Sequence, residues 1–211
     1  MTVAPQVVLL VHGTFERDPR VRRHAAAARD AGYRVAVLSV GSEREHPRWG
    51  EQVDGIAVFE SRSTDRTIAG RLRVLVSLLR RSRTNTGPAD QNEGSRHAVG
   101  AELPNSVPPL ARSSWRDLLD VALLIRQNIA VFRQFRGVGG RVVHANDLNV
   151  LPAGVLLARY WRAALLYDSH ELWTETNPAW SPFQRKLLSL LERLIIRRCD
   201  AVVTVNNAVA R

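Results

Sequence analysis

Short segments dominated by apolar residues recur along the chain, and stretches with apolar residues at helical spacing connect them. The apolar segments lie at residues 7–11, 34–40, 53–60, 142–145, 164–167 and 201–205. Nearly continuous apolar runs of this length are typical of strands buried on both faces, as the strands of a parallel sheet are. The pattern therefore predicts a sheet whose strands alternate with helices.

The connecting segments carry the signals that begin and end helices. Helices are expected at residues 20–31, 68–79, 112–135, 149–159 and 182–198. Asp18 and Pro19 match an N-cap and a first helical position, and Gly32 stands where a helix-ending glycine belongs. Ser181 and Gln184 have capping-box spacing. Because strand–helix–strand units prefer right-handed crossovers, we expect an α/β fold with a doubly wound, Rossmann-like parallel sheet.

Residues 84–111 differ from the rest of the chain in composition. They are rich in Pro, Gly, Asn, Ser and Thr, and they show neither helical nor strand periodicity. The alternation of strands and helices resumes beyond them. We therefore expect one domain over residues 1–211, with a flexible insertion at 84–111.

The charge of the chain indicates a negatively charged partner. Lys and Arg number 30 against 20 Asp and Glu, which gives a net charge of +10, and Lys186 is the single lysine. Aromatic residues make up 6% of the chain and do not alternate with basic runs, so the composition favours an anionic membrane or a phosphorylated ligand over nucleic acid. The predicted helix at 68–79 is flanked by arginines. It either lies on a membrane surface or packs on the sheet and exposes its arginines to water.

Several features predict a cytoplasmic location. Cys199 is the single cysteine, which suits a reducing compartment, and no apolar stretch is long enough to span a membrane. The N-terminal residues lack the basic segment and cleavage site of a signal peptide. Peripheral contact with the inner face of the membrane is compatible with these features. Cys199 itself is interpreted as inert packing.

Polar residues follow three of the predicted strands, at the edge where open parallel sheets bind ligands. The strand at 7–11 is followed by His12, Gly13, Thr14, Glu16, Arg17 and Asp18. The strand at 142–145 carries His144 and leads into Asn146 and Asp147. The strand at 164–167 leads into Asp168, His170, Glu171 and Glu175. Parallel strands bring these groups to one edge. His170 stands between acidic residues that would tune and orient its imidazole.

Two common phosphate-binding motifs are absent from the sequence. No GxGxxG follows the first strand and no GxxxxGK[ST] occurs, so the dinucleotide and P-loop fingerprints are missing. The glycines at residues 137–140 precede a strand, which makes them a turn. Glu43 and Glu51 are expected in a polar loop.

Four segments together resemble the N-terminal domain of GT-B glycosyltransferases of family 4. The segments are residues 18–23, 143–152, 167–173 and 192–205, and the resemblance covers nearly the whole chain except the insertion. It implies a hexosyltransferase-type enzyme that moves a sugar, with retention, from a UDP-, GDP- or ADP-sugar to a sugar or lipid-linked acceptor. It also implies that no metal and no cofactor are tightly bound.

The same resemblance implies that two domains bind the two substrates separately. The N-terminal domain receives the acceptor, and a C-terminal domain binds the donor and carries a pair of glutamates seven residues apart. This chain contains no such second domain, and Glu43 and Glu51 lie in the wrong domain to replace its glutamates. The resemblance therefore implies an incomplete enzyme that is inactive alone.

Site residues follow from the resemblance position by position. His170 matches the histidine that contacts the transferring sugar, and Asp168 and Glu171 would hold its orientation. Gly13 matches a glycine of the first strand-to-helix loop, where the family often has two. The donor or acceptor would also meet Thr14, Arg17, Arg20 and Asp147. Arg20 could equally form an ion pair on its helix, and His24, where an acidic residue is common in the family, is expected to matter little.

Two other functions remain open from the residues alone. One is a metal-dependent hydrolase with His144, Asp147, Asp168 and His170 as ligands, because these side chains suit a divalent ion. The other is a non-catalytic membrane-docking module that uses the arginine-rich segment at residues 68–83.

Overall fold

The computed structural model describes residues 4–42, 44–62, 114–169 and 180–204, all in one compact unit. The predicted helix at 68–79, the insertion at 84–111, Glu43 and the site residues His170 and Glu171 lie outside these ranges.

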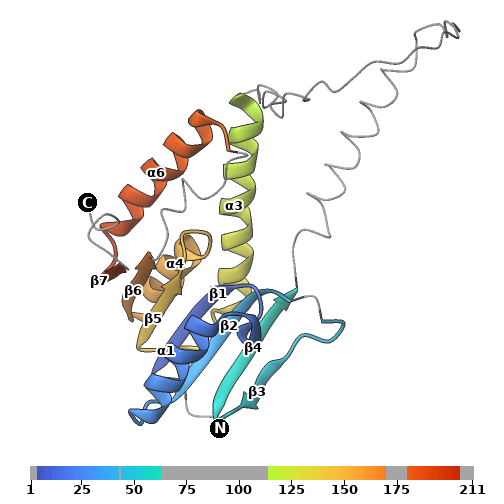
Figure 1. Ribbon diagram of the computed structural model, residues 1–211, viewed down its shortest axis with the longest axis vertical. Coiled ribbons are helices and arrows are strands. Elements are labelled where there is room, and N and C mark those ends of the chain that lie inside the picture. The colour runs from blue at the N-terminus through green and yellow to red at the C-terminus, as the bar shows by residue number, and fades with distance from the viewer. Residues whose placement is uncertain (1–3, 43, 63–113, 170–179, 205–211) are drawn as a thin grey trace, which may run out of the picture. The chain divides into compact units, whose positions relative to one another are not determined.

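A seven-stranded sheet forms the centre of this unit (Figure 1). Its strands are β1 (Val7–His12), β2 (Val35–Ser42), β3 (Trp49–Val53), β4 (Ile56–Arg62), β5 (Val142–Asn146), β6 (Ala164–Ser169) and β7 (Ala201–Thr204). Their order is β3-β4-β2-β1-β5-β6-β7, and every neighbouring pair is parallel except β3 with β4. The chain thus extends from β1 in both directions, which is the doubly wound topology that the sequence predicts.

Helices cover both faces of the sheet (Figure 1). They are the short 3-10 helix η1 (Phe15–Arg17) and the α-helices α1 (Pro19–Asp30), α3 (Ser114–Phe135), α4 (Leu151–Trp161) and α6 (Pro182–Ile196). On one face, Val21 and Ala25 of α1 share a core with Leu9 and Val11 of β1. The other face buries β1 and β5 side chains against α3, α4 and α6. The predicted α/β fold class is therefore confirmed.

Local sequence signals set the ends of α1 and α6 as predicted. One carboxylate oxygen of Asp18 accepts hydrogen bonds from the backbone N–H groups of Arg20 (2.9 Å) and Val21 (3.3 Å). The α1 helix is followed by Gly32, whose φ of +85° lies in the left-handed region that glycine adopts without strain. The hydroxyl of Ser181 accepts a hydrogen bond from the backbone N–H of Gln184 at 3.0 Å.

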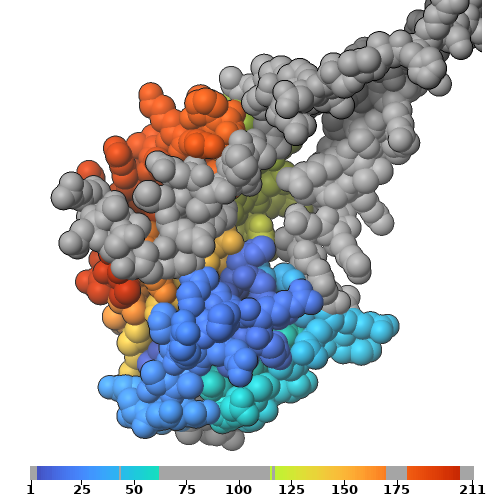
Figure 2. All heavy atoms as spheres, viewed as in Figure 1, coloured from blue at the N-terminus to red at the C-terminus, as the bar shows by residue number. Residues whose placement is uncertain are grey.

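The third predicted strand, at 53–60, is wrong in its extent. The structure has a hairpin there, with β3 and β4 joined by Asp54 and Gly55, whose φ angles are 51° and 77°. An Asp-Gly pair with two positive φ angles is a favoured two-residue hairpin turn. Glu51, expected in a polar loop, lies instead in β3. Figure 2 shows the hairpin, in cyan, next to the blue atoms of the β1–α1 region.

Candidate functional site

The strand order reverses at β1, which lies between β2 and β5. In doubly wound sheets, ligands bind beyond the carboxyl ends of the strands at this reversal. The carboxyl ends of β1, β5 and β6 are neighbours, as the sequence predicts. β1 leads into Gly13 and β5 into Asp147, and β6 ends at Ser169. The backbone N–H of Asp147 donates to the carbonyl of Asp168 at 3.2 Å, which joins the ends of β5 and β6.

The loop after β1 leaves room for a ligand at Gly13. Its φ is +105°, and apart from its chain neighbours no atom of the described residues lies within 4 Å of the place where a Cβ would stand. The backbone N–H of Gly13 donates to the carbonyl of Val40 at 2.7 Å, which fixes the loop to β2. Thr14 precedes η1, but its side chain makes no capping hydrogen bond with that helix.

The two candidate arginines of this loop differ in their surroundings. Arg17 is exposed at the end of η1. A guanidinium nitrogen of Arg20 lies 3.1 Å from a carboxylate oxygen of Asp18. The ion pair that the sequence left open for Arg20 is therefore present, and it neutralises part of the charge that a ligand would meet.

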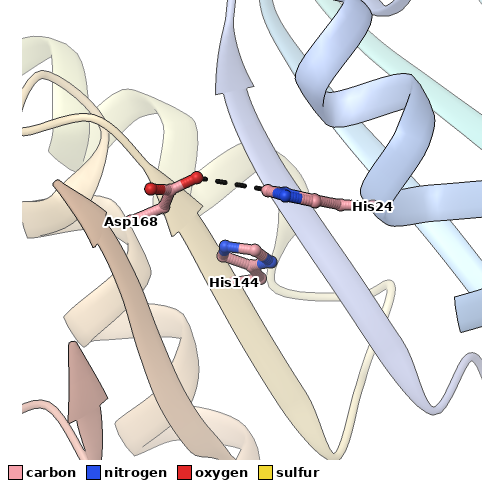
Figure 3. A group of neighbouring side chains, drawn as sticks. All are labelled: His24, His144 and Asp168. Carbon is pink, nitrogen blue, oxygen red and sulfur yellow. Dashed lines mark ion pairs between the residues drawn. The ribbon is translucent and has the colours of Figure 1, made fainter. Parts of the chain in front are cut away.

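Three side chains from three elements meet on the face of the sheet that α1 covers (Figure 3). His24 lies on α1, His144 on β5 and Asp168 on β6. The two imidazole rings are stacked, with centroids 5.2 Å apart and an angle of 22° between their planes. His24 Nδ1 lies 3.9 Å from a carboxylate oxygen of Asp168. We refer to these three residues as the His-His-Asp cluster.

Burial determines the charge state of His144. The residue is 8% exposed, and its Nε2 has no hydrogen-bond partner in the described part of the chain. Burial and the neighbouring charge of His24 lower the pKa of His144 to about 4, although Asp168 opposes this shift. The imidazole is therefore neutral near pH 7.

His24, which was expected to matter little, joins His144 and Asp168 in this cluster. A signal for it existed, because His24 follows the buried Val21 by three residues on α1 and so shares its face of the helix. Among the four ligands of the hydrolase hypothesis, His144 and Asp168 come together. Within the described residues the third member of their group is His24, and Asp147 is not part of it.

A second polar group, also missed, lies at the end of β4. The carboxylate of Glu60 is fully buried and accepts hydrogen bonds from the Arg48 guanidinium (2.7 Å) and the Arg48 backbone N–H (3.0 Å). A guanidinium nitrogen of the same Arg48 lies 2.6 Å from a carboxylate oxygen of Glu16 in η1. Burial alone would raise the pKa of Glu60, but the hydrogen bonds and charge of Arg48, with Arg44, hold it below its ordinary value. The network connects the loop after β1 to the segment between β2 and β3.

Comparisons with known proteins agree with this architecture. The family described as glycosyl transferase 4-like domain matches residues 18–211. No curated protein matches the sequence significantly. Among solved structures, a sucrose-phosphate synthase from Thermosynechococcus elongatus is similar, with 14% sequence identity and a TM-score of 0.51. The matched region covers 94% of this chain and 41% of the synthase chain.

An α,α-trehalose-phosphate synthase (UDP-forming) from Burkholderia vietnamiensis is also similar, with 12% sequence identity and a TM-score of 0.50. The matched region covers 98% of this chain and 40% of the synthase chain. At these identities the two structures show the fold alone. The chain spans about two fifths of the length of each synthase. Since the family match extends from Asp18 to the last residue, the chain belongs to the glycosyl transferase 4-like domain family, and its sheet is a Rossmann-like half of a GT-B fold.

Proposed function

We propose that this chain is the N-terminal, acceptor-side domain of a retaining glycosyltransferase. The enzyme moves a sugar from a UDP-, GDP- or ADP-sugar to a sugar or lipid-linked acceptor. The observation that carries the proposal is the convergence of the Gly13 loop, Asp147 and Asp168 at the strand reversal of a family 4-like fold. The family match favours neither the hydrolase nor the non-catalytic module.

Each candidate residue takes a role in this proposal. The open space at Gly13 admits a phosphate or the acceptor close to the backbone, and Thr14, Arg17 and Arg20 surround that loop. His170 contacts the transferring sugar, with Asp168 and Glu171 as its orienting acids. An imidazole at this place would hydrogen-bond a sugar hydroxyl and stabilise charge that develops on the reacting ring.

A second domain completes the enzyme in this proposal. Two synthases with this fold are about two and a half times as long as the region they share with the chain. We propose that the further length of such an enzyme is the donor-binding half, which would face the edge formed by β1, β5 and β6. We expect no sugar transfer by the 211 residues alone.

Fusion to a donor-binding domain of the same family tests the proposal. We expect the fusion to transfer sugar from at least one of a panel of UDP-, GDP- and ADP-sugars, measured by mass spectrometry of the acceptor. Asp168→Asn should lower this rate more than about tenfold, because the orienting carboxylate is lost. The matched control is Asp30→Asn, which changes an exposed carboxylate at the end of α1.

Two results would contradict the proposal. Transfer by the isolated chain, at the rate of the fusion, would show that no second domain is needed. A fusion whose activity falls equally in Asp30→Asn and Asp168→Asn would show that the strand reversal has no special role.

We also propose that the domain contacts an anionic membrane through α3. The residues Trp115, Leu118, Ile125 and Ile129 recur at intervals of three, seven and four positions along α3, and each is at least 38% exposed. Arg126 and Arg133 are exposed on the same helix. An apolar stripe with an aromatic residue and neighbouring arginines suits the interface of an anionic bilayer. In the described residues, no helix has the length and apolar content that crossing a bilayer requires.

Sedimentation with lipid vesicles tests this contact. The protein should sediment with vesicles that contain phosphatidylserine and should not sediment with vesicles of pure phosphatidylcholine. The double variant Leu118→Ser, Ile125→Ser should remain in the supernatant with both kinds of vesicle. The control Leu190→Ser, Leu194→Ser changes two exposed leucines of α6 and should still bind. Equal binding of both double variants would exclude α3 as the contact.

A further inference from the structure

The His-His-Asp cluster brings together the donor atoms of a metal site. One ring nitrogen of His24, one of His144 and one carboxylate oxygen of Asp168 all lie within 4.8 Å of one another. They come from α1, β5 and β6, so the fold and not a local sequence motif assembles them (Figure 3). Two imidazoles and a carboxylate form a ligand set that suits a divalent transition-metal ion.

His24 and Asp168 form a long ion pair with no hydrogen bond between the two side chains. Their closest approach, from His24 Nδ1 to the carboxylate of Asp168, is 3.9 Å, which is too long for a hydrogen bond. The stacking of His24 on His144 also places two rings together that would repel each other if both were protonated.

The unsatisfied nitrogen of His144 is the second, independent observation. Its Nε2 is buried and has no hydrogen-bond partner among the described residues. Buried polar atoms are nearly always paired, so one without a partner calls for an explanation. A neutral imidazole nitrogen is the form that binds a metal ion, and the unpaired Nε2 of His144 lies in the ring that stacks on His24.

We propose that His24, His144 and Asp168 bind one divalent transition-metal ion of the Zn²⁺ class. Bonds of about 2.0–2.1 Å in a tetrahedral site set ligand atoms about 3.3 Å apart, so the ligand atoms must approach one another by at most roughly 1.5 Å. His24 can supply that movement, because its side chain is 42% exposed while Asp168 is held in the sheet. The fourth ligand position would be filled by water.

The ion takes no part in the sugar transfer proposed above, for which the family resemblance implies no metal. Its effect is to connect α1 to β5 and β6. Because a bound ion would also occupy Asp168, which the proposed transfer uses, transfer is measured with the ion removed. The site therefore goes beyond the proposed function, and bound Zn²⁺ is expected to stabilise the fold.

Zinc binding by the full chain tests the proposal directly. After removal of metal with EDTA, titration calorimetry with ZnCl₂ should give one ion per chain, and elemental analysis after dialysis should agree. His24→Ala and Asp168→Asn should each weaken binding more than about tenfold. His46→Ala removes an exposed histidine of the segment between β2 and β3 and should leave the affinity unchanged.

Cobalt gives a readout of the coordination geometry. Co²⁺ at a four-coordinate site absorbs visible light strongly, whereas six-coordinate Co²⁺ absorbs weakly, so an intense band that disappears in His24→Ala is expected. Circular dichroism checks that each variant remains folded.

The proposal is overturned if the chain binds no zinc, or if His24→Ala binds it as tightly as the unaltered protein. Neither result bears on sugar transfer, which is measured with the fusion and EDTA present. Likewise, a fusion without transferase activity leaves zinc binding by the chain unaffected.

Discussion

Gly140 lies in the turn before β5, where the backbone passes close to the core. A Cβ added at this position would stand 2.7 Å from a methyl carbon of Val8 and 3.4 Å from the ring of Trp161. Val8 is fully buried in β1 and cannot move away without disturbing the core. At Gly137, three residues earlier, no atom of the described residues beyond its chain neighbours lies within 4 Å of the added carbon.

We expect Gly140→Ala to lower the free energy of unfolding by about 1–3 kcal/mol, because the methyl group overpacks a filled site. Gly137→Ala, the matched control, should change it by less than about 0.5 kcal/mol. Urea denaturation followed by circular dichroism measures both values. Equal stabilities for the two variants would show that the turn adjusts without cost.

Cys199 illustrates a residue whose chemistry its surroundings suppress. Burial, together with the charge of Asp200, raises the pKa of the thiol to about 11. The thiolate is the reactive form, so at pH 8 we expect the folded protein to react with a disulfide reagent about a hundredfold more slowly than the unfolded chain. The absorbance of the released thiol gives the reaction rate of the folded and of the unfolded protein. Equal rates would mean that the thiol of Cys199 is accessible and that its pKa is not raised.

At the scale of elements, the Glu60 network joins segments whose own sequences give no sign of pairing. Glu60 lies near the end of β4 and binds Arg48 from the segment between β2 and β3, and Arg48 in turn binds Glu16 of η1. A buried carboxylate in such a network contributes mainly by compensating a buried arginine, so removing one partner is costly.

We expect Glu60→Gln to lower the free energy of unfolding at pH 7 by about 3 kcal/mol, because Arg48 loses its buried counter-charge. The folded pKa of Glu60 is below its unfolded value, so this contribution is present above the unfolded pKa and is lost as pH falls through the folded pKa. The stability difference between the unaltered protein and Glu60→Gln should therefore shrink on acidification.

Urea titrations at pH 7 and near pH 4 measure this change. The control Glu51→Gln alters an exposed glutamate of β3 and should have little effect at either pH. A Glu60→Gln protein as stable as the control would contradict the role assigned to the network.

Elements were predictable where their signals are local. The cap at Asp18 and the hydroxyl of Ser181 act within three residues of their own sequence, and the predicted starts of α1 and α6 are confirmed. β3 was missed because it is a largely exposed edge strand without an apolar run. The place of His24 in the His-His-Asp cluster was not predicted, because its neighbours lie on β5 and β6, far along the chain. The roles of Gly13, Thr14, Arg17, Arg20 and Asp147 remain predictions.

At the scale of the whole molecule, β7 forms one edge of the described sheet. Val202 and Val203 on this strand are 41% and 45% exposed, although strands of parallel sheets are usually covered on both faces. An apolar strand at the edge of a sheet is a template for pairing with another chain.

We therefore expect the isolated chain to self-associate in a concentration-dependent way, as measured by sedimentation velocity. Val202→Lys should reduce the association, because a charged side chain on an edge strand opposes strand pairing. Tyr33→Lys replaces an exposed aromatic residue between α1 and β2 and should not reduce it. Association that responds equally to both variants would indicate a general effect of charge.

The position of β1 between β2 and β5 also sets the order in which the sheet can be completed. During synthesis β1, β2 and the β3–β4 hairpin emerge first and can pair with one another. The other side of β1 stays open until β5 has been made, since Val7 pairs with Val142. Contacts so distant in sequence close late and slow the folding of a domain. Among the described strands, β1, which leads to the proposed ligand-binding loop at Gly13, is therefore separated in synthesis by the longest interval from its second neighbouring strand.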